Sequence, residues 1–202
     1  MYIPKHTRVE DEATLFAFLE RYSFATLIST SGGHPTASHL PLVLDRENRC
    51  LMGHFARANS QWTDISGEEV LAIFHGPHTY ISSSWYETNQ SVPTWNYAAV
   101  HAYGQAELIE DEAELLQCLN EMVAKYEEPG SAYRIDDSNR DTIDGLMKGI
   151  VGFRIRLDRL EGKWKLSQNH SKERQALVIS KLEQSSSNNA QEIARLMREN
   201  NA

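Results

Sequence analysis

The sequence predicts a mainly β protein with flanking helices (α+β), in which an antiparallel meander closes into a small barrel. Segments rich in β-branched and aromatic residues follow one another at 24–30, 35–44, 49–55, 70–74, 79–82 and 97–109. Turn-forming residues separate these segments, at 31–34, 45–48 and 76–77. Only the short stretch 56–65 interrupts the series, whereas a parallel doubly wound sheet needs a helix between each pair of strands.

Helices are predicted before and after this meander. Residues 11–22 carry Leu15, Phe16, Leu19 and Tyr22 at helical spacing. Apolar spacing also predicts a helix at 111–126, which ends before Pro129-Gly130. A shorter helix is expected at about 139–148. Strict alternation then predicts a strand over 151–158, a turn at Glu161-Gly162 and a short strand over 163–167.

The C-terminal tail has helical character on both sides of the polar stretch 185–189. We therefore expect a barrel domain over 1–170 and a helical extension over 171–202. No internal repeat is visible.

Composition and charge narrow the class of protein. The 202 residues are 41% hydrophobic and 24% charged, which is typical of a folded globular chain. No apolar stretch approaches the roughly 18 residues of a membrane helix, and the first residues lack a signal-peptide core, so we expect a cytoplasmic protein without a membrane partner. Cys50 and Cys118 are far apart and outside any CxxC motif, so we expect ordinary core or surface thiols.

The net charge of −8 is unevenly distributed. Residues 107–144 hold twelve acids against three bases, whereas 148–165 hold six bases against two acids. This second segment predicts either a patch that meets an anion or a solvated strand face.

Several common sites lack their sequence motif. His75 and His78 flank a Gly-Pro turn signal with no HExxH motif nearby, so we expect no metal site there. GxSxG, P-loop and GxGxxG motifs are absent. A phosphorylated cofactor would then be held by side chains and strand ends.

Two stretches have the residue types for such a ligand. Residues 53–62 end a strand and present Arg57, Asn59 and Gln61 beside the small Ala56 and Ala58, which is either an anion cradle or a plain strand-to-helix corner. Residues 80–86 and 92–97 are dense in aromatic and hydroxyl side chains. They suit a flat heterocycle or an aromatic belt that closes the barrel.

These residues also carry a resemblance to a known family. The matching segments read MYIPKH (1–6), GHPTASHLPL (33–42), GHFARANSQW (53–62), GPH (76–78), YISSSWY (80–86), VPTWNY (92–97), VHAYG (100–104) and KLSQN (165–169). Together they resemble the PaiB family, described as FMN-binding negative transcriptional regulators. The resemblance runs in register from residue 1 to about residue 170.

The resemblance implies an FMN-binding split β-barrel that holds FMN at a homodimer interface. It implies flavin contacts from Ser38, His39, His54, Ala56, Arg57, Asn59, Thr94, Trp95, Asn96, Lys165 and Gln168. Of these, His54, Arg57 and Asn59 would stand near the phosphate. Two residues depart from the family pattern. Ser60 stands where the pattern leads us to expect proline, and His170 where it leads us to expect arginine.

The first functional hypothesis is an FMN-binding homodimer that represses transcription of protease-production and sporulation-type genes, a binding protein rather than an enzyme. A flavin-dependent oxidoreductase is the alternative, with His39, His54 and His101 as the eligible acids or bases. A haem-binding or haem-degrading barrel is a third. The near-neutral tail predicts weak DNA affinity, so repression would act through a partner protein, through flavin redox state or through the 148–165 patch doubled in a dimer.

Overall fold

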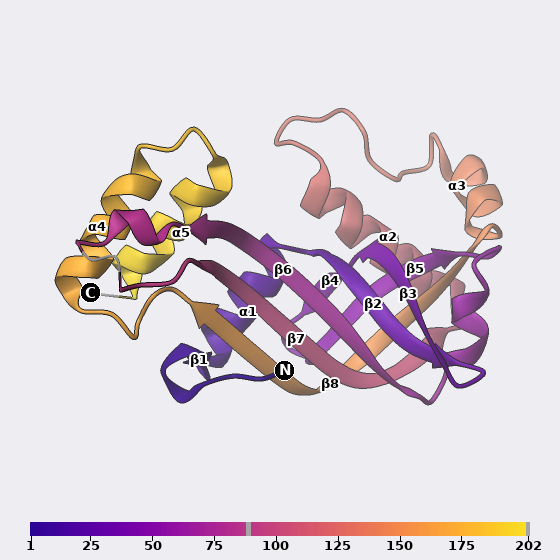
Figure 1. Cartoon of the computed structure of the whole chain (residues 1–202). Helices are drawn as coiled ribbons and strands as arrows, with labels where there is room; N and C mark the ends of the chain where they lie inside the picture. The colour runs from indigo at the N-terminus through magenta and orange to yellow at the C-terminus, as the bar shows by residue number, and fades with distance from the viewer. Residues whose placement is uncertain (88–89, 201–202) are drawn as a thin grey trace. The chain divides into compact units, whose positions relative to one another are not determined.

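Strands hold more residues than α-helices, and helices precede, connect and follow the strands along the chain (Figure 1). The structure is a computed structural model that describes residues 1–87 and 90–200. The strands are β1 (Arg8–Val9), β2 (Phe24–Ser31), β3 (His34–Pro41), β4 (Val43–Asp45), β5 (Cys50–Ala56), β6 (Glu69–Ile81), β7 (Thr94–Ile109) and β8 (Ile150–Lys165). The α-helices are α1 (Glu12–Arg21), α2 (Glu112–Tyr126), α3 (Arg140–Met147), α4 (Lys172–Glu183) and α5 (Asn188–Glu199). Short 3-10 helices are η1 (Lys5–Thr7), η2 (Ser60–Asp64) and η3 (Ser83–Trp85).

The described strands form one sheet in the order β3-β2-β6-β7-β8-β5-β4, with β1 paired to β8. The β2–β3 hairpin is antiparallel and turns through Gly32 and Gly33, which both have positive φ. Strand β5 pairs antiparallel with β8, from Cys50 opposite Arg156 to Ala56 opposite Ile150. The predicted mainly β, antiparallel fold class is confirmed.

The chain divides into two compact units, which we describe separately. Unit 1 comprises residues 1–15, 75–101 and 161–202, and unit 2 comprises residues 16–74 and 102–160. The division falls within α1, β6, β7 and β8. None of these divisions falls at residue 170, the boundary expected from the sequence. The separate extension over 171–202 stays a prediction.

The core of unit 2 lies on the buried face of its strands. Phe55 and Phe153 are fully buried with ring centroids 4.7 Å apart. Gly53 leaves room for Leu42 and Phe153, because a Cβ there would lie 2.7 Å from Leu42 Cδ2 and 3.0 Å from the Phe153 ring. Helix α2 adds Cys118 and Met122 to a cluster with Val43, Cys50 and Met52 of β4 and β5.

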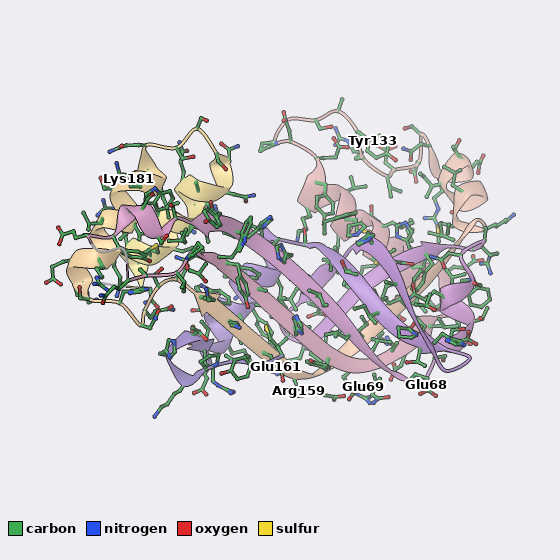
Figure 2. The ribbon with its side chains drawn as sticks, viewed as in Figure 1. Glu68, Glu69, Tyr133, Arg159, Glu161 and Lys181 are labelled. Atoms are coloured by element: carbon green, nitrogen blue, oxygen red, sulfur yellow. The ribbon has the colours of Figure 1, made fainter. Side chains whose placement is uncertain are left out.

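In unit 1, α4 and α5 lie side by side (Figure 1). Buried apolar residues of this pair are Val178, Ile179, Leu182, Ala190, Ile193, Ala194, Leu196 and Met197. Lys181 lies on the exposed side of α4 (Figure 2). Both helices therefore have the one-sided apolar pattern that the tail sequence predicts.

Three sequence predictions about strand ends are wrong. Strand β6 runs unbroken through Gly76-Pro77, where two consecutive residues are buried, a pattern typical of a β-bulge that tolerates proline. Strand β8 runs unbroken through Gly162, which is needed for close approach rather than for a turn, because a Cβ there would lie 2.3 Å from Leu15 Cδ2. The predicted strand 35–44 is instead two strands, β3 and β4, separated at the buried Leu42.

Candidate functional site

The corner after β5 carries Arg57, and three hydrogen bonds fix it to the start of β8. The backbone N–H of Arg57 donates to the carbonyl of Gly149 at 2.8 Å. Its Nε and Nη2 donate to the carbonyls of Lys148 and Ile150, each at 2.7 Å. Among the described residues nothing accepts from Nη1, and the side chain is exposed. Arg57 is therefore a structural corner residue that still presents a cation to solvent.

Asn59 connects this corner to β3. Its side-chain Nδ2 donates to Ser38 Oγ at 2.8 Å, and its Oδ1 accepts from the Gln61 backbone N–H at 3.0 Å as the N-cap of η2. Ser38 and Asn59, both predicted at the flavin, are thus in direct contact. The helix that follows this corner is a five-residue 3-10 helix.

Gln61 is not presented to a ligand, contrary to the sequence prediction. Its side chain is 1% exposed. Nε2 donates to the Leu27 carbonyl, Ser29 Oγ and the Thr36 carbonyl, whereas Oε1 is buried without a partner in the described structure. Gln61 therefore anchors η2 beneath the β2–β3 hairpin.

Three other residues of unit 2 were predicted at the flavin, and they differ in burial: His54, Ala56 and His39. His54 lies opposite Gly152 in the β5–β8 pair, its Nδ1 is buried without a described partner, and burial lowers its pKa, so the ring is neutral at pH 7. Ala56 is exposed at the end of β5. His39 is exposed and its Nδ1 lies 3.0 Å from Thr26 Oγ1, on the opposite face of β3 from Ser38, since consecutive strand residues alternate.

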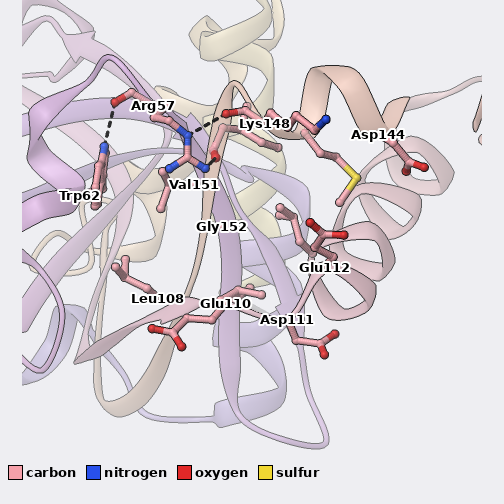
Figure 3. A pocket seen from close by; sticks show the side chains of 14 residues that line it. Arg57, Trp62, Leu108, Glu110, Asp111, Glu112, Asp144, Lys148, Val151 and Gly152 are labelled. Carbon is pink, nitrogen blue, oxygen red and sulfur yellow. Dashed lines mark hydrogen bonds between the residues drawn. The ribbon is translucent and has the colours of Figure 1, made fainter. Parts of the chain in front are cut away.

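An open cleft of about 850 Å³ lies beside Arg57 (Figure 3). Its walls are Arg57, Trp62, Leu108, Ile109, Glu110, Asp111, Glu112, Leu115, Asp144, Met147, Lys148, Ile150, Val151 and Gly152. Figure 3 shows Arg57 and Trp62 at the opposite end from Glu110 and Asp111, and Trp62 Nε1 donates to the Arg57 carbonyl at 2.9 Å. Four carboxylates face two bases, so only the Arg57 end favours an anion.

The predicted residues of unit 1 form a second group. Lys165 Nζ donates to Thr94 Oγ1 and to the Trp95 carbonyl, and burial together with Lys163 lowers its pKa. Trp95 is 52% exposed and packs edge-on to Tyr80, with ring centroids 6.1 Å apart. These side chains leave an aromatic surface open on β6 and β7.

Asn96 and Gln168 are occupied by the fold. Asn96 is fully buried, and its Nδ2 donates to Ser167 Oγ at 3.0 Å and contacts Met197 Sδ at 3.6 Å. Gln168 Oε1 accepts from the Leu166 N–H at 2.7 Å and its Nε2 donates to the Trp164 carbonyl. Both amides hold the segment after β8 in place.

The basic segment 148–165 does not present a free basic face. Arg154 pairs with Glu107 at 3.0 Å and with Glu114 at 2.5 Å, and Arg156 pairs with Glu107 at 3.5 Å. Lys163 is buried and donates to the Tyr2 carbonyl. The sequence alone does not show these partners, of which Glu107 and Glu114 belong to the acidic segment 107–144.

The two cysteines and the helices bear on two further predictions. Cys50 and Cys118 are free and buried, as core thiols, and burial raises their pKa to about 11 and about 12. None of the described helices is long and apolar enough to cross a membrane.

Comparisons with known proteins agree with this fold. The family model described as "Putative FMN-binding domain" matches residues 1–159. Protease synthase and sporulation protein PAI 2 of Bacillus subtilis (strain 168) is 40% identical over 201 residues, which cover 98% of this chain and 96% of that protein. An uncharacterised protein of Emericella nidulans is 30% identical over 206 residues, with 81% of each chain covered.

Solved structures share the fold at low sequence identity. The flavocytochrome Anf3 of Azotobacter vinelandii has a TM-score of 0.63 at 14% identity, over 87% of this chain and 78% of that one. The FAD and heme binding protein of Mycobacterium smegmatis has a TM-score of 0.59 at 13% identity, over 84% of this chain and 78% of that one. With the family model and the antiparallel sheet, they identify the fold as a split β-barrel. The chain, a split β-barrel, therefore belongs to the PaiB family.

Proposed function

We propose that this protein is an FMN-binding homodimer that acts in the cytoplasm as a negative regulator of transcription, on protease-production and sporulation-type genes. The observation that carries the proposal is the 40% identity to PAI 2 across 98% of the chain, a relative named for protease synthesis and sporulation. The match of residues 1–159 to the FMN-binding domain supports the choice of cofactor.

The residues of unit 2 fit the phosphate end of FMN. Arg57 presents a guanidinium nitrogen, Nη1, that no described residue occupies, and the Lys148 side chain also lines the cleft. Ser38 and Asn59 supply neutral donors beside this corner. A charge-assisted pair with one phosphate suits a mononucleotide. When bound, FMN would supply one- or two-electron redox chemistry, and Arg57 would orient the phosphate.

The contacts expected from Thr94, Trp95, Asn96, Lys165 and Gln168 stay predictions from the family resemblance. The homodimer is also part of the proposal. Its support in unit 1 is the exposed aromatic surface of Tyr80 and Trp95, 47% and 52% exposed, because monomers seldom leave large apolar patches uncovered. Light scattering at micromolar concentration tests the homodimer, because it compares the mass in solution with the chain mass of 23.0 kDa.

Titration of the apoprotein with FMN and with FAD tests the cofactor. We expect FMN to bind more tightly than FAD, because the Arg57 corner provides for one terminal phosphate. Equal affinity for FAD, or no binding of FMN, contradicts the proposal. The optical spectrum separates the alternatives, since a nicotinamide nucleotide bleaches the flavin of an oxidoreductase, and a Soret band identifies haem.

We expect DNA binding by the FMN-loaded protein to be weak at physiological salt, with a Kd of about 1 μM or higher. The reason is that Arg154 and Arg156 are paired with Glu107 and Glu114 instead of facing solvent alone. The measurement is a fluorescence titration against promoter and random DNA. The Glu107→Gln, Glu114→Gln double variant is the matched control, because it frees both arginines and should bind more tightly.

Sub-micromolar, sequence-selective binding by the unmodified protein would instead favour direct repression. Weak binding by the unmodified protein and by the double variant would favour repression through a partner protein or through the redox state of the flavin.

A further inference from the structure

A shift in the burial pattern of β6 accompanies two histidines that lie on one exposed side of the strand in unit 1. Burial alternates along the strand up to Phe74 and His75, and then both Gly76 and Pro77 are buried. Because the alternation shifts by one residue, His75 and His78 point to the same side although they are three positions apart. Both side chains are exposed in the single chain. The Gly-Pro dipeptide therefore joins the two imidazoles instead of separating them.

The two rings are in edge-to-face contact, at a separation that is also compatible with two ligands of one ion. Their centroids are 4.7 Å apart with an interplanar angle of 63°. Two imidazoles that share one ion at metal–nitrogen distances near 2.0–2.1 Å place their ring centres about 4.6–5.3 Å apart, for angles from a right angle to tetrahedral. The observed separation lies in this interval, so an ion could be accommodated by small ring rotations.

The backbone favours one ring nitrogen of His78 as the ligand. Its Nδ1 lies 3.4 Å from the Gly76 carbonyl oxygen, a long contact in which the ring N–H can donate. Metal-binding histidines commonly donate the other ring N–H to a backbone carbonyl in this way, which leaves Nε2 as the free acceptor. Nε2 of His78 is thus the nitrogen available to an ion.

We propose that His75 and His78 form a two-histidine site for a divalent transition-metal ion of the Ni²⁺, Cu²⁺ and Zn²⁺ group, with water completing the coordination. Among the described residues no third His, Cys, Asp or Glu joins the pair. Neutral imidazoles without a carboxylate favour these ions over Mg²⁺ and Ca²⁺, which require oxygen ligands. The neighbouring Trp95 ring, 6.2 Å from His78 between centroids, lies close enough to report on an ion held there.

The test uses the full chain without a polyhistidine tag, with Ni²⁺ as the probe in isothermal titration calorimetry. We expect one Ni²⁺ per chain, and a loss of affinity of about ten-fold or more in His75→Ala and in His78→Ala separately. The matched control is His34→Ala, an exposed histidine of unit 2, which should leave affinity unchanged. Loss of affinity in His34→Ala, or none in either variant of the pair, overturns the proposal.

A second measurement does not depend on affinity. Cu²⁺ should quench the tryptophan fluorescence of the wild-type protein, and Trp95→Phe should remove most of that change, because Trp95 is the indole beside the pair. Electron paramagnetic resonance of the Cu²⁺ complex should show two coupled imidazole nitrogens. Quenching that persists in Trp95→Phe, or a spectrum with one imidazole, would place the ion elsewhere.

Discussion

Replacement of Gly104 by alanine is expected to destabilise the protein by at least about 3 kcal/mol, a large effect for the addition of one methyl group. A Cβ at this position would lie 2.0 Å from the carbonyl oxygen of Arg156 and 2.8 Å from its carbonyl carbon. Both atoms belong to the backbone of β8, the neighbour of β7 in the sheet. They cannot move without separating the two strands, so the ladder must open locally.

Gly145→Ala is the matched control for this prediction. Gly145 lies within α3, and a Cβ there meets nothing within 4 Å. Alanine at a helical position should therefore stabilise the protein by up to about 1 kcal/mol. Urea unfolding of the three proteins followed by circular dichroism measures both changes. An unchanged midpoint for Gly104→Ala would mean that β7 and β8 lie far enough apart at this position to admit a methyl group.

Local patterns predicted the helices because each of them buries a single stripe. The spacing that predicts helix α2 is that of Leu115, Leu116, Leu119 and Val123. Of these only Leu115 is buried, and the other buried residues of the helix are Cys118 and Met122. The continuity of β6 and β8 could not be predicted in the same way. Gly76-Pro77 and Glu161-Gly162 have the chemistry of turns, and the close approach of α1 explains the glycine of the second pair inside a strand.

The candidate site was predictable in location but not in bonding. Arg57 lies at the end of a strand, as the sequence indicates, yet its hydrogen bonds reach carbonyls more than ninety positions away through the pairing of β5 with β8. The same limit applies to Gln61. Its polarity suggested exposure, but buried carbonyls of β2 and β3 bind its amide. Long-range pairing determined both outcomes, and one sequence does not contain that information.

Arg57→Ala is expected to lower the affinity for FMN by about ten-fold or more, and the affinity for riboflavin much less. A charge-assisted hydrogen bond to phosphate contributes about 1.5–3 kcal/mol, and riboflavin has no phosphate. The guanidinium also donates to the carbonyls of Lys148 and Ile150, so the variant should lose stability as well. Flavin fluorescence titrations with both ligands, beside a thermal unfolding curve, separate binding from folding.

Arg57→Gln separates the two roles of the side chain more sharply. A glutamine amide can still donate to a backbone carbonyl at the start of β8 but carries no charge for a phosphate. We therefore expect it to recover part of the stability lost in Arg57→Ala while FMN affinity stays low. If the affinities for FMN and riboflavin fall equally in both variants, Arg57 serves only the corner between β5 and β8. The phosphate would then have to be held by other residues.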